Sequence, residues 1–267
     1  MSSEAAWNPP NPDVTGTAIG APKPPSLVGQ TVDRLGEAIV GGTYQPGTVL
    51  PPEAELARVF GVSRNVVREA VKVLAANGLV RVSRGSGTTV EPAADWNYFD
   101  QSVIGWMLAH EDQRDQLVDE LSTLRFIIEP EVAALAAEFA TTTEILRLFE
   151  AFEAMERHLH EPQKAVEADI LFHRRLFEAA HNRLLMGMLR TVVAVLRANF
   201  ALAIKADYAI IEFLEEHRVV AEAINRREPD AARAAMQVLL SNNKKNLTAM
   251  RREVAKQPPV KPGAAKP

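Results

Sequence analysis

The chain has 267 residues and no cysteine; 47% of its residues are hydrophobic, 24% are charged, and the formal net charge is −4. This composition is typical of a globular protein with one large or two ordinary domains, and it excludes disulfides and cysteine-based zinc sites. No uninterrupted apolar run approaches ~18 residues and no signal peptide is evident, so we expect a cytoplasmic protein with no membrane partner.

Proline-rich segments lie at both ends of the chain. The N-terminal segment contains "WNPPNPDVTG" and is weakly patterned, and the C-terminal segment ends in "KQPPVKPGAAKP". Sequence of this kind does not supply a packed core. We therefore predict a flexible arm at residues 1–26 and a disordered tail at residues 251–267.

The part of the chain from residue 27 to residue 92 has the pattern of a winged helix-turn-helix. Its hydrophobic spacing predicts helices at residues 27–41, 52–60 and 64–78. Two short β-type runs, "LVRVS" and "TTVEP", follow on either side of the turn "RGSG". The charge is uneven as well: residues 56–90 hold six Lys or Arg and one Glu (6 − 1 = +5), which leaves −4 − 5 = −9 for the rest.

The third predicted helix carries side chains suited to reading DNA. Arg64 and Arg68 lie one turn apart on one face, with Asn65 beside them. Arginine can bind guanine and asparagine can bind adenine in the major groove. Arg84, next to Gly85 in the turn, is placed to contact the minor groove or a phosphate. The alternative, a surface helix with ordinary solvated arginines, fits the local charge and the glycine-rich turn less well.

The segment "LPPEAELARVFGVSRNVVREAVKVLAANGLVRVSRGSGTTV" resembles the DNA-binding domain of GntR-family bacterial transcription regulators. The resemblance places operator contacts on Ser63, Arg64, Asn65, Arg68, Arg84 and Gly85. Two positions depart from the family pattern. Pro52 replaces the usual serine that caps the second helix, and Ala54 stands where many members carry an arginine that contacts DNA. We therefore expect the capping box to be lost and one operator contact to be absent.

The remainder of the chain has helical patterning and no strand signal. Seven helices are predicted, at residues 97–110, 113–139, 142–159, 163–180, 184–206, 209–227 and 230–250. The breaks fall at Pro162, at His181-Asn182 and at Pro229. The predicted fold is therefore mainly α, with the winged helix-turn-helix at residues 27–92 and an all-α helical-bundle ligand-binding domain at residues 97–250.

Three ionisable side chains fall on the apolar faces of two of these helices. Asp169 and His173 are one turn apart in "VEADILFHRRLFEAA", and His217 lies on the apolar stripe of its own helix. Burial of an unpaired ionisable group costs several kcal/mol, so these groups should satisfy one another or bind a cation. Two interpretations stay open: an Asp–His hydrogen bond with His217 satisfied separately, or a divalent metal site for Zn²⁺, with Ni²⁺ or Mn²⁺ as alternatives.

Residues 97–250 resemble the all-helical FCD-type effector domain of the FadR subfamily, through "ADILFHRRLFEAAHNRLL" and "EEHRVVAEAINRREPDAARAAM". That resemblance implies a divalent metal held by Asp169, His173 and His217. It also implies a fourth ligand, at the position where this chain has Leu239. The missing ligand leaves one coordination position to water or an effector, and it weakens the case for a bound metal.

Arg125 is a further charged residue on an inward stripe, between Leu121 and Ile128. It can form a helical pair with Glu129, worth only tenths of a kcal/mol if the pair is exposed. The resemblance instead implies that this arginine holds the carboxylate of an effector, a group that a guanidinium binds with two hydrogen bonds. Asn199, on the apolar side of its helix, is a weaker candidate for the same pocket.

These features predict a ligand-responsive transcription regulator. The stretches "WNYFDQSVIGWML" and "SNNKK" resemble a branch of the family that responds to sugar acids such as D-galactonate. We expect a homodimeric repressor that leaves its operator DNA when a small carboxylate effector, such as an aldonic acid, binds. The alternatives are a regulator of another hydroxy or uronic acid, an architectural DNA-binding protein and a metal-dependent enzyme. We expect no enzyme, because no motif offers a nucleophile or a general base.

Overall fold

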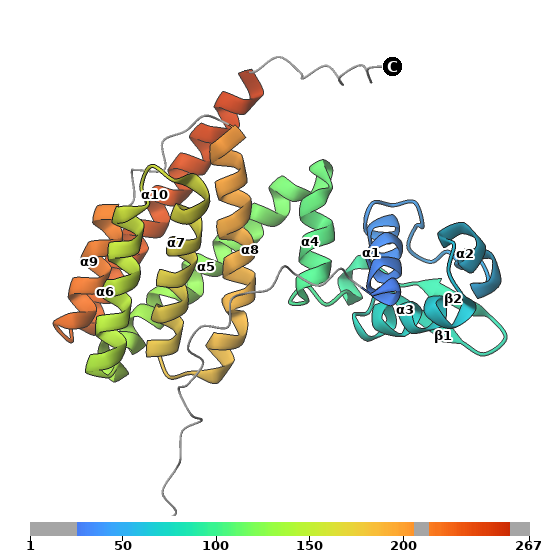
Figure 1. Cartoon of the computed structure of the whole chain (residues 1–267), viewed down its shortest axis with the longest axis horizontal. Coiled ribbons are helices and arrows are strands. Elements are labelled where there is room, and N and C mark those ends of the chain that lie inside the picture. Colours follow the sequence, from blue (N-terminus) through green and yellow to red (C-terminus); the bar gives the residue numbers. More distant parts are fainter. Residues whose placement is uncertain (1–25, 206–213, 257–267) are drawn as a thin grey trace, which may run out of the picture.

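The structure is a computed structural model that describes residues 26–205 and 214–256, and it has two lobes joined by one helix (Figure 1). The smaller lobe contains α1 (Leu27–Val40), α2 (Glu53–Phe60), α3 (Arg64–Ala76), β1 (Val80–Ser83) and β2 (Gly87–Val90). A single 3-10 turn, η1 (Ala93–Asp95), leads into the connecting helix α4 (Gln101–Ala109). The larger lobe contains α5 (Glu111–Phe139), α6 (Thr142–Arg157), α7 (Pro162–Ala179), α8 (Arg183–Lys205), α9 (Leu214–Asn225) and α10 (Pro229–Lys256).

The smaller lobe confirms the predicted winged helix-turn-helix. Ser26 and Ser63 accept hydrogen bonds from backbone amides at the starts of α1 and α3, whereas Pro52 gives α2 no side-chain cap. One side of α3 packs against α1 and α2 and buries its valine and leucine side chains. The antiparallel hairpin pairs Val80 with Val90, so its turn extends away from the core. The opposite side of α3 and the hairpin tip therefore remain exposed.

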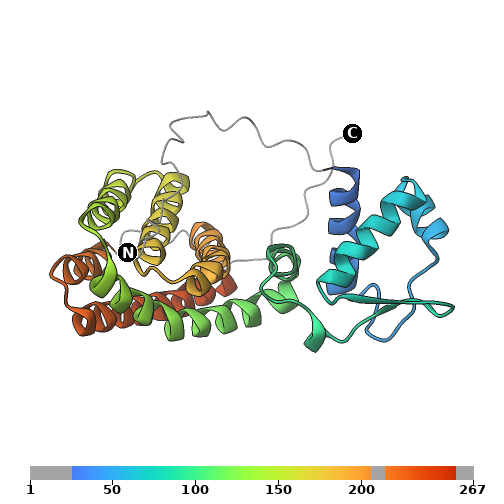
Figure 2. The same ribbon diagram turned by 90° about the horizontal axis from the view of Figure 1, so that it is seen from below.

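The larger lobe is the predicted all-α bundle. α5 and α10 run side by side along one face in Figure 2. α7 and α9 pack against this pair, and α6 packs against α7 and α9. Its core is built from large side chains that face inward, with alanines where helices approach closely. The fully buried members include Val132, Leu148, Phe172, Phe177, Ile224 and Met236. The inward stripes of α5, α7 and α9 therefore meet inside this lobe.

Most helix boundaries lie within two residues of the prediction, and the largest differences in the described residues are at the start of α4 and the end of α10. α4 begins at Gln101 because Asp100 accepts hydrogen bonds from two backbone amides and acts as its N-cap. α10 continues to Lys256, so the expected tail at residues 251–267 is wrong for its first residues. The extension is held by Arg251, which donates to the carboxylate of Asp119 on α5. The expected arm before Ser26, the first part of the predicted helix at 209–227 and the tail after Lys256 lie outside the described residues.

Within the described part of the chain, one helix is long and apolar enough to cross a membrane by length and composition alone, over Arg183–Ile204 of α8. The sequence pattern did not single it out because Arg190 and Arg197 interrupt its apolar residues. In the structure α8 packs against α4, α5, α7 and α10, and Val192 and Val195 are buried there. We therefore assign α8 to the bundle.

The connecting helix α4 packs against both lobes. Trp106 belongs to the hydrophobic core of the smaller lobe, and its indole N–H donates to Asp33 of α1 over 3.3 Å. Ile104 instead packs with buried residues of α5 and α8. At the start of α5, the Gln113 amide donates to the backbone oxygen of Val40 at the end of α1, over 2.7 Å. The smaller lobe is therefore joined to the bundle through packed side chains.

Gly36 of α1 is required for this junction, so we expect Gly36→Ala to destabilise the protein by about 1–3 kcal/mol. A Cβ at position 36 would lie 2.5 Å from the ring of Trp106, so the ring or the helix would have to move. The measurement is thermal unfolding of the full chain. The control Gly105→Ala, inside α4, adds a Cβ with nothing within 4 Å and should stabilise by about 0.5–1 kcal/mol. Unchanged stability of Gly36→Ala would contradict the packed junction.

Candidate functional site

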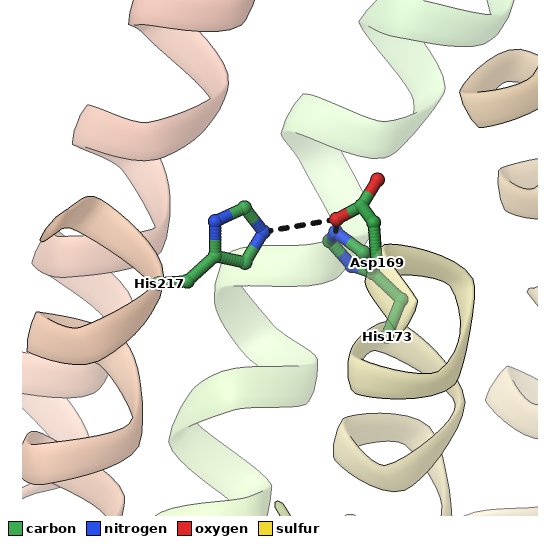
Figure 3. A group of neighbouring side chains, drawn as sticks. All are labelled: Asp169, His173 and His217. Atoms are coloured by element: carbon green, nitrogen blue, oxygen red, sulfur yellow. Dashed lines mark ion pairs between the residues drawn. The ribbon is translucent and has the colours of Figure 1, made fainter. Parts of the chain in front are cut away.

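The three predicted polar residues of α7 and α9 meet inside the bundle, as Figure 3 shows. Oδ1 of Asp169 lies 3.1 Å from Nε2 of His217 and 3.6 Å from Nε2 of His173. Both histidines are buried, while the Asp169 side chain is 24% exposed. The three potential ligand atoms lie within 4.8 Å of one another. The structure thus brings together two residues of one helix and one residue of another.

A buried carboxylate of α5 contacts the ring nitrogen of His173 that faces away from Asp169. Glu129 is fully buried, and its Oε2 lies 2.8 Å from Nδ1 of His173. Arg125, also buried, donates through Nε to Oε1 of Glu129 and through Nη2 to Oε2 over 3.4 Å. The same Nη2 lies 3.5 Å from Nε2 of His173. These side chains and the residues of Figure 3 form one connected network, which we call the buried network (Arg125, Glu129, Asp169, His173 and His217).

Glu129 is the residue of this network that the sequence pattern did not place in the site. Its spacing from Arg125 matches an ordinary helical ion pair, and such pairs usually lie at the surface. The sequence did contain a signal for its burial. Glu129 lies next to Ile128 and three residues before Val132, and both of these belong to the inward stripe of the helix. The Arg125–Glu129 pair, which the sequence offered as the alternative to an effector contact, is present, but it is buried and also reaches His173.

Both carboxylates of the buried network are ionised. Burial alone would raise the pKa of Glu129, but attraction to Arg125 and His173 outweighs it and lowers this pKa to about 2. Burial also opposes ionisation of Asp169, whereas its contacts with His217 and His173 hold its pKa below the ordinary value. Metal ligation requires neutral imidazoles, so with a metal bound the positive charge beside the carboxylates would come from Arg125 and the metal. With both carboxylates ionised, the five side chains themselves then carry 1 − 1 − 1 = −1. A divalent cation would change this charge to +1, which a monocarboxylate would neutralise.

The donor set fits a divalent metal. One carboxylate oxygen with two imidazole nitrogens is a ligand set typical of Zn²⁺. Oδ1 of Asp169 is buried and, although both imidazoles are close, accepts no hydrogen bond of acceptable angle from the described residues. Glu129 faces the other ring nitrogen of His173, as a carboxylate commonly does beside a metal-bound imidazole. Leu239, at the position of the missing fourth ligand, is fully buried and apolar.

The buried network forms part of the wall of a cavity, which we call the inner cavity. It measures about 100 Å³, and Arg125, Asp169, Asn199 and His217 line it together with apolar side chains. One water needs about 10–15 Å³, so this space holds several waters or part of a small ligand. Oδ1 of Asn199 is buried and accepts no hydrogen bond from any residue the structure describes. Arg125 and Asn199, the two residues predicted for the effector, therefore line the same space.

The predicted DNA contacts lie on the exposed surface of the smaller lobe. The hydroxyl of Ser63 accepts from a backbone amide of the first turn of α3, which starts the helix at Arg64. The side chains of Arg64 and Asn65 point away from the core. Arg84 and Gly85 occupy the tip of the hairpin, where Gly85 has a φ of +83° that favours glycine. These residues form an exposed cationic surface suited to a groove of DNA.

Arg68 is paired with a carboxylate of the same lobe, a contact that the sequence pattern did not predict. Its guanidinium donates to both oxygens of Glu53 at the start of α2, over 3.2 and 2.8 Å. The hydrogen bond from Arg68 lowers the pKa of Glu53. A base contact by Arg68 must therefore use its remaining N–H groups or break this pair. Arg64 makes no ion pair within the described ranges and is the freer of the two.

Replacing Arg64 with alanine should weaken binding to a specific operator by about 1–3 kcal/mol, the worth of a bidentate contact to guanine. The operator is first selected from random duplexes, and affinity is then measured by fluorescence anisotropy. Arg147→Ala removes the same charge from the exposed side of α6 and should leave the affinity unchanged. Wild-type affinity in the Arg64→Ala protein would rule out Arg64 as a base contact.

Comparison with known proteins assigns both lobes. Residues 27–90 match the bacterial regulatory proteins of the gntR family, and residues 120–242 match the FCD domain. The chain is 33% identical to the galactonate operon transcriptional repressor of Escherichia coli (strain K12), over 81% of this chain and 94% of that protein. It is 31% identical to the Uxu operon transcriptional regulator of the same organism, over 86% and 89%.

The fold is similar to the solved structure of Lar from Listeria monocytogenes, with a TM-score of 0.56 and 20% identity over 85% of this chain and 99% of that one. The matched families and relatives are regulators of transcription and not enzymes. The winged helix-turn-helix and the helical bundle behind it agree with that assignment. This chain therefore belongs to the GntR family of bacterial transcription regulators and carries an FCD domain.

Proposed function

We propose that this regulator represses genes of sugar-acid catabolism and leaves its operator when an aldonic acid such as D-galactonate binds. Membership of the GntR family supports operator binding by the smaller lobe, and the FCD domain supports a small-molecule effector in the bundle. The similarity to the galactonate operon repressor supports an aldonic acid as that effector. A cytoplasmic location follows from this role.

The observation that carries the proposal is the buried network on the wall of the inner cavity. Arg125 receives the effector carboxylate, because a guanidinium binds a carboxylate through two parallel N–H groups. Asn199 donates to or accepts from the same ligand through its amide. Asp169, His173 and His217 hold a divalent metal, with Zn²⁺ preferred, and the metal supplies positive charge beside the carboxylate. The cation and the anion together neutralise a site whose own charge is −1.

Repression and release require two conformations. A homodimer places two winged helices on the two half-sites of a pseudo-palindromic operator. The effector must bind the arrangement that does not fit the operator more tightly, by a few kcal/mol. The packed junction around α4 carries the change, because α4 contacts both the smaller lobe and the helices α5 and α8.

A gel-shift titration tests the effector. The selected operator is bound by the full chain and challenged with aldonic, uronic and short hydroxy acids. Release by aldonic acids at lower concentration than by the others is the expected result. If a uronic or short hydroxy acid releases the operator at lower concentration than aldonic acids do, that acid and not an aldonic acid is the effector. If no acid releases the operator, the sensor role is contradicted.

Elemental analysis of the purified protein tests the metal. We expect about one zinc for each wild-type chain and a large loss in His173→Ala. His181→Ala, which removes a half-exposed histidine that contacts Glu144, should retain the metal. Absence of any divalent metal from the wild-type protein, before and after incubation with zinc, would contradict the metal role of Asp169, His173 and His217.

A further inference from the structure

A second cavity shares the Arg125 side chain with the inner cavity. It measures about 500 Å³ and lies between α5 and α10; we call it the vestibule. The residues that line both spaces are Arg125, Asn199, Asn243 and Leu247. A ligand whose carboxylate binds Arg125 can therefore extend in either direction, into the inner cavity or into the vestibule.

The two spaces differ in chemistry. Beyond the buried network, the inner cavity is lined largely by apolar side chains, among them Met155, Leu159, Val166, Leu196, Phe200 and Leu214. The vestibule wall is also apolar over most of its area, through Phe126, Leu240 and Leu247 among others. It differs in adding the hydroxyl and ammonium groups of Ser122, Thr123, Ser241, Lys244 and Lys245, which the inner cavity lacks. A chain of hydroxylated carbons loses its hydrogen bonds to water against the apolar wall of the inner cavity without replacing them. Against the vestibule wall it can replace them.

The hydroxyl groups of the vestibule are arranged as acceptors. Ser122 donates its proton to the backbone oxygen of Val118 over 2.6 Å, and Ser241 donates to that of Gln237 over 2.7 Å. A hydroxyl that donates to its own helix keeps its lone pairs for another donor. The O–H groups of a polyol are such donors.

Two lysines supply the complementary donors. Lys244 and Lys245 follow Asn243 on α10, and neither forms an ion pair with any residue in the described ranges. Their ammonium groups can donate to the oxygens of a polyol. The vestibule therefore offers both halves of the hydrogen bonds that a hydroxylated chain makes.

We propose that the vestibule is the subsite for the hydroxylated chain of the effector, with the carboxylate at Arg125. This inference rests on the proposed function and narrows the ligand class to a polyhydroxylated monocarboxylate of several carbons. A short hydroxy acid leaves the vestibule to water, and an acid with an apolar tail extends into the inner cavity.

Calorimetric titration of the full chain tests the subsite with two six-carbon acids, D-galactonate and hexanoate. Wild-type protein should bind D-galactonate more tightly. The double variant Ser122→Ala/Ser241→Ala should bind D-galactonate roughly 10-fold more weakly, at roughly 3-fold for each lost hydrogen bond, and should bind hexanoate as before. Both substitutions place alanine in a helix, so folding is expected to be retained. Ser102→Ala on α4, outside both cavities, is the matched control and should change neither affinity.

The outcomes separate the subsite from the proposed function. Unchanged D-galactonate binding by the double variant would mean that the hydroxylated carbons of the acid lie outside the vestibule. That result would overturn the subsite while leaving the aldonic acid as effector. Tighter binding of hexanoate than of D-galactonate by the wild-type protein would mean that the carbon chain of a bound acid lies in the apolar inner cavity. That result would also overturn the subsite. Binding of neither acid by the wild-type protein would overturn both proposals.

Discussion

Replacing Glu129 with alanine should destabilise the FCD domain by about 3–5 kcal/mol, the range expected when one partner of a buried ion pair is removed. The substitution leaves the guanidinium of Arg125, which is 3% exposed, without the carboxylate that it contacts. It also removes the oxygen that lies 2.8 Å from Nδ1 of His173. Urea unfolding of the full chain, followed by circular dichroism, measures the loss.

The matched control lies two residues further along the same helix. Glu131 pairs with Arg233 over 2.7 Å, but its side chain is 56% exposed. Solvent-exposed pairs contribute about 0–1 kcal/mol, so Glu131→Ala should cost little. If the two substitutions lower the free energy of unfolding by the same amount, the buried network does not stabilise the domain more than an exposed ion pair does.

Replacing Arg125 with lysine should separate folding from sensing. Lysine keeps a positive charge beside Glu129 but lacks the planar fork that binds a carboxylate with two hydrogen bonds. Affinity for the operator without acid should stay within about 2-fold of wild type. The concentration of D-galactonate needed for release should rise roughly 10- to 100-fold, since hydrogen bonds to charged groups contribute about 1.5–3 kcal/mol. Anisotropy of labelled operator during titration with the acid measures both quantities.

Arg233→Lys is the control for this change. Arg233 also makes a bidentate contact, with Glu131, at the exposed side of the bundle. The same substitution there should leave the dose response unchanged. A wild-type dose response in the Arg125→Lys protein would mean that this guanidinium does not hold the effector.

Much of the fold follows from the sequence because the spacing of apolar residues along a helix is visible within a short stretch of consecutive residues. The inward stripes of α7 and α9 contain Asp169, His173 and His217, and polar residues on an apolar stripe have few partners except one another. Their meeting could therefore be predicted without knowledge of how the helices cross. Boundaries were less certain, as α4 shows, because one capping residue decides where a helix begins.

Contacts between distant segments were not predictable in this way. Glu129 has the spacing of a surface pair, and only the packing of α7 against α5 places His173 beside it. Arg68 has the position of a base contact, and only the approach of α2 to α3 provides Glu53 as its partner. These residues acquire their environment from tertiary packing, which periodicity does not describe.

A crystal structure of the metal-loaded full chain with D-galactonate tests the central claim, that the buried network binds a carboxylate, most directly. We predict the carboxylate on the guanidinium of Arg125, beside Asp169, His173 and His217. A saturated complex with the acid bound away from Arg125 would contradict the claim.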